Sequence, residues 1–213
     1  MKYLVDWFGP KIETHSAVES TSCISANRLG VHRKGGDFLT IAPIQVDVLT
    51  QAVAEEVLRD GEATIICLVP KTSHYLWVAR ERANQLGSDV QTMREVFWAL
   101  GMVDPQGFLD KDVDSTIRIL GQHSRVERVQ MICESTMKVV RLGGMSDVKV
   151  SVAYGYEFGE ETLVKELERH PDVDVVLNSN PNGRATASAL EHAKHAGVRL
   201  LDLSSLMGEL RNS

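Results

Sequence analysis

The chain has 213 residues, of which 43% are hydrophobic and 24% are charged, and its formal net charge is −6. This length suits one large domain or two small ones, and the composition is that of an ordinary globular protein. The acidic balance excludes a histone-like or polybasic protein, because non-specific affinity for DNA depends on many lysines and arginines that meet phosphates. A local basic patch is still compatible with these numbers.

The sequence predicts neither a signal peptide nor a membrane span. Asp6 falls where a signal peptide needs an apolar core, and no later stretch approaches the roughly 20 apolar residues that cross a bilayer. Cys23, Cys67 and Cys133 lie far apart and form no CxxC pair, which predicts neither a disulfide framework nor a zinc ribbon. We therefore expect a cytoplasmic protein with no membrane contact. Separately, we expect a prokaryotic origin.

The first half of the chain predicts three strands, a helix, a strand and a helix. The strands are marked by β-branched and small polar residues around turn-like segments, and the helices by apolar residues at helical spacing. By residue number these elements are strands at 13–26, 31–34 and 37–41, a helix at about 46–58, a strand at 63–69 and a helix at 76–86.

Residues 101–114 contain Pro105, two glycines and a cluster of acids, which is typical of a linker. We therefore predict a first module at 1–104, a linker at 105–114 and a second module at 115–213.

The second half predicts the same order of elements. They are strands at 125–135, 137–142 and 147–153, a helix from about 160, a strand at 173–177, a helix from about 185, a short strand at 198–202 and a closing helix.

The two halves also match in sequence, which predicts a tandem duplication. At an offset of 108 residues, the segment from His15 to Gly36 matches the segment from His123 to Gly144 in nine of 22 positions, where chance gives about one or two. An insertion of two residues then shifts the offset to 110, so that Asp37 pairs with Asp147. We expect an α/β fold of two tandem β-β-β-α-β-α modules with mixed sheets, arranged as a pseudo-two-fold dimer.

The strand order and the segment from Asp172 to Asp202 resemble restriction-endonuclease-like domains, particularly the Mrr type. This resemblance implies an acid on one strand and an Asp/Glu-x-Lys triplet on the next, where carboxylates hold Mg²⁺ and the lysine positions or activates water. Asp147-Val-Lys149 matches the triplet, and Glu127 or Glu134 is the partner acid. The metal ligands implied are Asp147 and Glu127.

Two alternatives stand beside this resemblance. Asp-x-Lys is also a common product of ordinary surface alternation on a strand, and the first half has Asp37-Phe-Leu39 without the lysine. The carboxyl-terminal strand, helix and short strand also resemble half of a BRCT domain, although the tryptophan typical of its last helix is missing.

The sequence His-Ser-x-Val-Glu occurs in both halves, from His15 and from His123. Alternation on a strand would place each histidine on the same face as the following glutamate, Glu19 or Glu127, where the pair could share a proton or a metal. The same pattern is equally typical of a polar cross-strand pair. A hydrolase that uses His15 and His123 is therefore a third hypothesis.

Two further segments are candidates for phosphate contact. His32, Arg33 and Lys34 stand before a Gly-Gly turn, and Arg141 holds the corresponding place in the second half. A solvated hairpin turn explains the same residues.

The second segment is the loop from Asn178 to Arg184, which includes Asn180 and Asn182 and follows a predicted strand. That position is where α/β sheets bind ligands, and the loop amides and Arg184 are candidates for anion binding. Asn-Pro and Asn-Gly are also ordinary turn sequences.

The leading hypothesis is a nuclease-like protein that engages nucleic acid or nucleotide, with Mg²⁺-dependent phosphodiester hydrolysis. The alternative is a non-catalytic interaction or ligand-binding module built on a duplicated α/β scaffold, with a protein partner. A further homo-oligomer is compatible with either.

Overall fold

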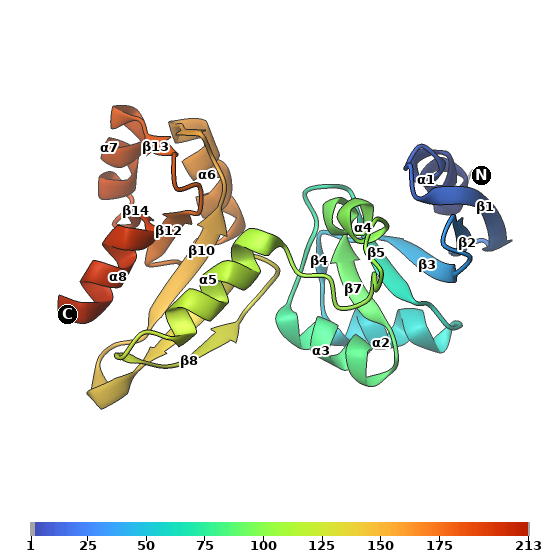
Figure 1. The fold of residues 1–213 in the computed structure, drawn as a ribbon, viewed down its shortest axis with the longest axis horizontal. Helices are drawn as coiled ribbons and strands as arrows, with labels where there is room; N and C mark the ends of the chain where they lie inside the picture. Colours follow the sequence, from blue (N-terminus) through green and yellow to red (C-terminus); the bar gives the residue numbers. More distant parts are fainter. Residues whose placement is uncertain (1–2, 213) are drawn as a thin grey trace. The chain divides into compact units, whose positions relative to one another are not determined.

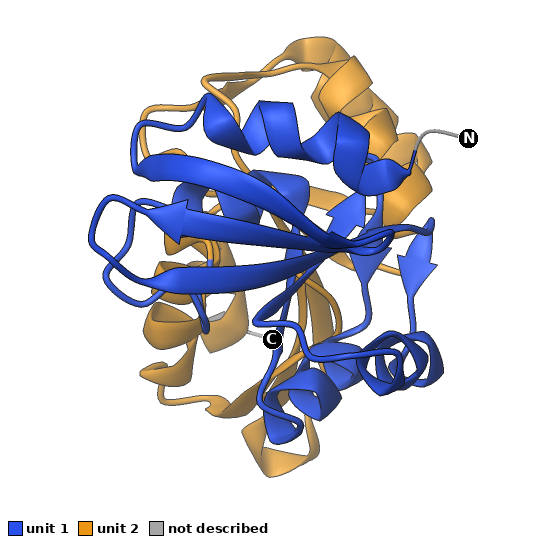
Figure 2. Cartoon of the chain, turned by 90° about the vertical axis from the view of Figure 1, so that its right-hand side faces the viewer, with its two compact units in different colours: residues 1–109 blue, residues 110–213 orange. Residues whose placement is uncertain are grey.

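The computed structural model describes residues 3–212 (Figure 1). The chain divides into two compact units, residues 1–109 and residues 110–213 (Figure 2). Within the described residues, no helix is long and apolar enough to cross a membrane.

Unit 1 begins with a helix and continues with a three-stranded meander. Its elements are α1 (Leu4–Glu13), β1 (Val18–Ser25), β2 (Arg28–Arg33), β3 (Phe38–Gln45), β4 (Val48–Leu49), α2 (Gln51–Arg59), β5 (Ile65–Val69), β6 (His74–Tyr75), α3 (Trp77–Gln85), β7 (Asp89–Thr92) and α4 (Met93–Ala99).

The main sheet of unit 1 is mixed and has the order β1-β2-β3-β5-β7. β1, β2 and β3 are antiparallel, whereas β3, β5 and β7 are parallel. Successive residues of β5 face opposite sides, so Cys67 packs with α1 and α4, and Ile66 and Leu68 pack with α2 and α3. Both faces of the parallel half are thus covered, as the uninterrupted apolar run of β5 indicates.

Unit 2 has the same succession of elements, with one added 3-10 turn. They are α5 (Lys111–Gly121), β8 (Val126–Met131), β9 (Thr136–Arg141), the 3-10 turn η1 (Leu142–Gly144), β10 (Val148–Ala153), β11 (Glu157–Phe158), α6 (Glu160–Arg169), β12 (Val175–Asn178), β13 (Arg184–Ala185), α7 (Ala187–His195), β14 (Arg199–Asp202) and α8 (Leu203–Asn212).

The main sheet of unit 2 has the order β8-β9-β10-β12-β14, which matches unit 1 strand for strand. α6 and α7 pack on one face through Leu163, Ala189 and Ala193, while α5 and α8 lie on the other (Figure 1). In each unit, the two loops that follow the first pair of parallel strands also form a small parallel sheet, β4–β6 or β11–β13. The predicted α/β class with mixed sheets is confirmed.

Five elements of unit 1 and the start of unit 2 differ from the sequence-based prediction. α1, β7, α4 and the short strands β4 and β6 were not expected, β4 lying inside the predicted helix, and α5 begins inside the segment predicted to be a linker. α5 has the ordinary signature of a helix start, because the Asp110 side chain accepts a hydrogen bond from the Asp112 amide and acids fill the first turn. The acidic cluster thus marks a helix cap.

The strand ladders correct the residue offset between the halves. Ile41 lies between Leu29 and Ile65, and Val150 occupies the same place between Met137 and Val175. The offset in β3 and β10 is therefore 109 residues, so Asp147 corresponds to Phe38 by ladder position.

Candidate functional site

Asp147 directly precedes β10, and its carboxylate lies 2.7 Å from Lys138 Nζ on β9. Lys149 stands opposite Lys138 in the β9–β10 ladder. The hydrogen bond from Lys138 holds the pKa of Asp147 below its ordinary value, and Arg128 lowers it further. Asp147 is thus paired with a cation, which Mg²⁺ would have to displace.

Glu134 lies far from Asp147. It sits in the turn between β8 and β9, nearly buried, with Oε1 3.2 Å from Nη2 of Arg169 on α6. Since Thr136 pairs with Ser151, Glu134 and Asp147 are at opposite ends of the β9–β10 pair, about six residues or roughly 20 Å apart.

Glu127 is exposed on β8, where its carboxylate contacts Arg128. It is separated from β10 by the whole of β9, so two strand spacings of about 5 Å each lie between them. Within the described residues, no group of three or more His, Cys, Asp or Glu side chains is placed to hold a metal ion. The residues present therefore do not fit the Mg²⁺ site that the resemblance implies.

His15 and His123 occupy the same turn in the two units. Each follows the first helix, and its Nδ1 accepts a hydrogen bond of 3.2 Å from the amide two residues on, Ala17 or Arg125. Their backbones also match, because each carbonyl accepts from the first residue of the next strand, Val18 or Val126. The expected strand face shared with a glutamate is wrong, since both histidines precede the strand, and their role in the structure is to close a turn.

Arg33 and Arg141 are buried rather than displayed on a turn. Arg33 donates to the Asp37 carboxylate at 2.8 Å and to the carbonyl of Leu100 at 3.1 Å, and to carbonyls of the following loop. These contacts close the carboxyl end of α4, whose last carbonyls lack helical partners.

The other two residues of this basic segment are exposed. The His32 ring packs at 4.7 Å from the Phe38 ring. Lys34 lies in the turn after β2, where its amide donates to the Ala17 carbonyl. Of the three basic residues, Lys34 and His32 alone are open to a ligand.

The loop from Asn178 to Arg184 uses its amides internally. The amide of Asn180 donates to the Asn178 side chain, that of Asn182 to the Asn180 side chain, and that of Gly183 to the Asn180 carbonyl. The amides of Ser179 and Arg184 donate to carbonyls of the β10–β11 segment. Because Pro181 has no amide, no backbone donor of this loop is left for an anion.

The same loop clamps Gly155, which follows β10. The Asn178 side chain accepts from the Gly155 amide at 3.1 Å and donates to the Gly155 carbonyl at 3.0 Å. Gly183 packs so closely that an added Cβ would lie 2.3 Å from the Gly155 carbonyl oxygen. The backbone at Gly155 is therefore held from both sides.

Two tyrosines flank this clamped glycine and point into solvent. Tyr154 is 60% exposed and Tyr156 is 74% exposed. Arg184 is close by, because its amide donates to the Tyr156 carbonyl at 3.0 Å, and Glu157 pairs with it in the β11–β13 ladder. Among the residues that the structure describes, no hydrogen bond or ion pair holds the Arg184 guanidinium. Sequence analysis missed both tyrosines, although Tyr-Gly-Tyr after an apolar strand was a visible signal.

A cysteine and a histidine meet inside unit 2 without forming a reactive pair. Cys133 Sγ lies 3.8 Å from Nδ1 of His170, and Ser135 Oγ lies 3.4 Å from Nε2. Burial raises the pKa of Cys133 to about 11, so the thiol stays protonated at neutral pH and is a poor nucleophile.

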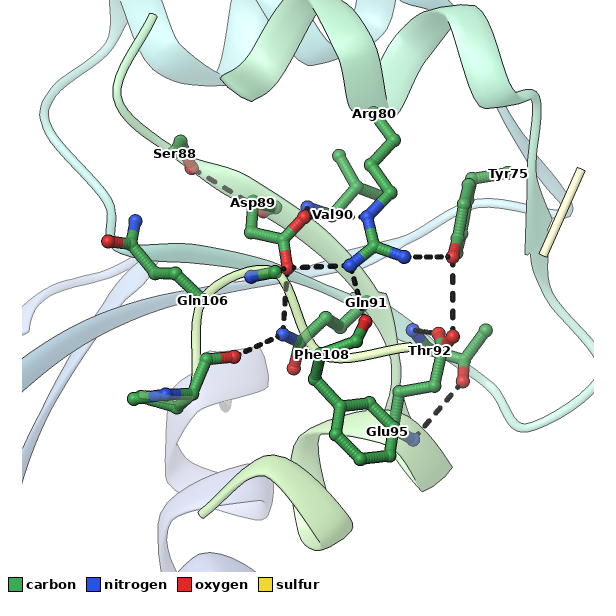
Figure 3. Close-up of polar contacts among 12 residues, drawn as sticks. Tyr75, Arg80, Ser88, Asp89, Val90, Gln91, Thr92, Glu95, Gln106 and Phe108 are labelled. Atoms are coloured by element: carbon green, nitrogen blue, oxygen red, sulfur yellow. Dashed lines mark hydrogen bonds and ion pairs between the residues drawn. The ribbon is translucent and has the colours of Figure 1, made fainter. Parts of the chain in front are cut away.

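Unit 1 contains a buried polar network around Arg80 and Asp89, on α3 and β7 (Figure 3). Arg80 Nε lies 2.8 Å from Asp89 Oδ1, and the guanidinium also donates to the Tyr75 hydroxyl and the Phe108 carbonyl. Asp89 in turn accepts from the Gly107 amide at 3.0 Å. The network fastens the segment after α4 to the edge of the sheet, which is a structural task.

Comparisons of the chain with protein-family models, with curated proteins and with solved structures found no match.

Proposed function

We propose that this chain is a non-catalytic binding module made of two copies of one α/β unit, and that unit 2 binds single-stranded nucleic acid. The observation that carries the proposal is the clamped Gly155, which presents Tyr154 and Tyr156 to solvent beside Arg184.

Exposed tyrosines on a rigid backbone suit nucleobases. A base stacked on an aromatic ring contributes about 1–3 kcal/mol, and every base has a face that can stack. The Asn178 clamp fixes the backbone between the two rings, which lowers the entropy lost on binding. The tyrosines also follow a strand of the parallel part of the sheet, the edge at which α/β proteins bind ligands.

The positive charge at this site is small, which limits the number of phosphate contacts that a nucleic acid can make here. Arg184 is its cation, and Glu157 lies beside it in the β11–β13 pair. One phosphate contact predicts a shallow dependence of affinity on salt, with a slope of about −0.7 in a plot of log K against log salt for a single strand. Stacking, rather than phosphate contact, would therefore dominate.

The duplication within this proposal rests on matched contacts as well as on the matched strand order. His15 and His123 close the same turn with the same hydrogen bond, and Arg33 and Arg141 are both buried at the end of the second strand. The pseudo-two-fold arrangement of the two copies belongs to the same proposal.

Mg²⁺-dependent hydrolysis receives less support from the geometry. Cleavage at Asp147 would require the carboxylate to leave Lys138, and Glu134 lies at the far end of the strand pair. For this reason we propose binding without cleavage.

The test measures the fluorescence anisotropy of labelled single-stranded RNA, single-stranded DNA and duplex DNA. We expect single strands to bind, and Tyr156→Ala to weaken binding about 5- to 150-fold, the equivalent of one lost stack. Tyr156→Phe keeps the ring and should bind like the wild type. Leu190→Ala is the matched control, because Leu190 is an exposed apolar side chain of the same unit.

Charge is tested by comparing Arg184→Ala with Arg125→Ala, which removes an exposed arginine in the turn after α5. Absence of binding, or binding that Tyr156→Ala leaves unchanged, would refute the proposed site. Cleavage of any of these nucleic acids with Mg²⁺ that is lost in Asp147→Ala would instead support the nuclease hypothesis.

A further inference from the structure

β1 has an open edge in unit 1. It is the first strand of the sheet, and within residues 3–212 it pairs with β2 alone. Of its eight residues Val18 alone is buried, and no charged residue occurs between Ser20 and Asn27. Natural edge strands usually carry charges, prolines, β-bulges or a cover that prevents another strand from adding. β1 has one charge, Glu19, near its start, and irregular register between Val18 and Ser20 and between Cys23 and Ser25, which leaves Ser20–Cys23 as its regular stretch.

A side chain takes the place of an added strand at the middle of this edge. The Glu13 carboxylate, at the end of α1, accepts hydrogen bonds from the Thr21 amide at 3.1 Å and from its hydroxyl at 2.6 Å. Amides of a strand lie in the plane of the sheet and alternate in direction between its two sides. Because the Thr21 amide donates to Glu13, it points away from β2. Glu13 Oε1 thus occupies the position that the carbonyl oxygen of a neighbouring strand would take.

The equivalent edge in unit 2 is protected differently. At the offset of 108 residues, Gly121 stands where Glu13 does, so no carboxylate reaches β8 from that position. Instead β8 carries Glu127 and Arg128, both exposed. β8 therefore carries two exposed charges on the strand itself, whereas the middle of β1 is capped by the Glu13 side chain.

We propose that the β1 edge is an interface for a second copy of this chain, with β1 adding to β1 in an antiparallel, two-fold manner. Pairing centred on Ser22 uses the regular stretch of β1, Ser20–Cys23, and places the two Ser22 residues opposite each other, so that no like charges meet at the two-fold axis. Thr21 then pairs with Cys23 of the other copy. Glu13 leaves the Thr21 amide, and a backbone carbonyl of the second copy accepts its hydrogen bond.

In this arrangement Glu13 competes with the second copy for the Thr21 amide. In Glu13→Ala the Thr21 amide loses its acceptor within the monomer. Because dimerisation then no longer breaks a hydrogen bond, the dimer should form at about a tenfold lower concentration. Glu13→Gln keeps an acceptor oxygen at the same position and should stay closer to the wild type. Ser22→Lys places two like charges opposite each other at the two-fold axis and should abolish the dimer.

Sedimentation velocity over a range of protein concentrations measures the association. Gln130→Lys is the matched control, because Gln130 holds on β8 the place that Ser22 holds on β1. A short bis-maleimide reports the register independently. Cys23 is exposed while Cys67 and Cys133 are buried, and the pairing centred on Ser22 brings the two Cys23 Cα atoms to about 8 Å.

The expected result is a dimer that Glu13→Ala strengthens, that Ser22→Lys removes and that Gln130→Lys leaves unchanged, with crosslinking through Cys23. Circular dichroism of Ser22→Lys and Gln130→Lys confirms that both variants are folded. A wild type and a Glu13→Ala variant that both stay monomeric would overturn the proposal, and so would a dimer that the folded Ser22→Lys variant retains.

Discussion

The buried pair of Arg80 and Asp89 gives a prediction about the stability of unit 1. The two side chains are 3% and 1% exposed, so Arg80→Leu would leave the Asp89 carboxylate in the core without its cation. Breaking a buried pair in this way costs about 3–5 kcal/mol. The Gly107 amide and the Gln91 side chain still donate to Asp89, so we expect about 3 kcal/mol. Adding Asp89→Asn removes the stranded charge and should recover about half of the loss.

The chain offers a control and a selective probe for this measurement. Arg82 lies on the same helix and is 2.6 Å from Glu55, but its side chain is 38% exposed, so Arg82→Leu should cost no more than about 1 kcal/mol. All three tryptophans, Trp7, Trp77 and Trp98, belong to unit 1. Tryptophan fluorescence during urea unfolding therefore reports on unit 1. An Arg80→Leu variant no less stable than Arg82→Leu would refute the reasoning.

Three further predictions concern titration, thiol reactivity and packing. Burial raises the pKa of the Glu95 carboxyl above its unfolded value of about 4.3. The contribution of Glu95 to stability therefore falls as the pH rises from the unfolded pKa through the folded pKa. In urea unfolding, the stability of Glu95→Gln relative to the wild type should increase from pH 4.5 to 7, and a decrease would contradict this. In the folded protein, iodoacetamide at pH 8 should label exposed Cys23 and spare buried Cys133, whose pKa is about 11, and equal labelling by mass spectrometry would contradict the burial. Gly183→Ala would force a methyl group against the Gly155 carbonyl. It should lower the stability of unit 2 by about 1–3 kcal/mol, measured by circular dichroism, and abolish nucleic-acid binding. Unchanged stability would contradict the close packing of Gly183 on Gly155.

The strands and central helices could be predicted because their signals are local. β5 is a run of apolar residues, and α3 and α7 end shortly before Gly87 and Gly197, which adopt positive φ angles as glycines after helices often do. α1 was missed although Val5, Phe8 and Ile12 are spaced for one buried helix face. Its Pro10 and short length weakened the signal, since proline usually ends a helix or bends it.

The partners of the charged residues could not be predicted from the sequence. Asp147 meets Lys138 because the register of β9 against β10 places them together, and a one-residue change of register would turn every side chain to the other face. Arg33 likewise contacts carbonyls nearly 70 positions further along the chain. A short motif such as Asp-x-Lys gives the residue types at a site but not which cation or carbonyl the fold brings to them.

The proposed duplication also changes where function should be sought. The positions that both units retain, such as the turn histidines and the buried Arg33 and Arg141, make the contacts that close the hairpin and the helix ends. Other positions differ between the units, including those that follow β3 and β10. By ladder position Tyr154 and Tyr156 replace Gln45 and Asp47 of unit 1. Identity between two copies within one chain therefore marks what the fold needs, whereas a binding role specific to one copy must rest on residues that the other lacks.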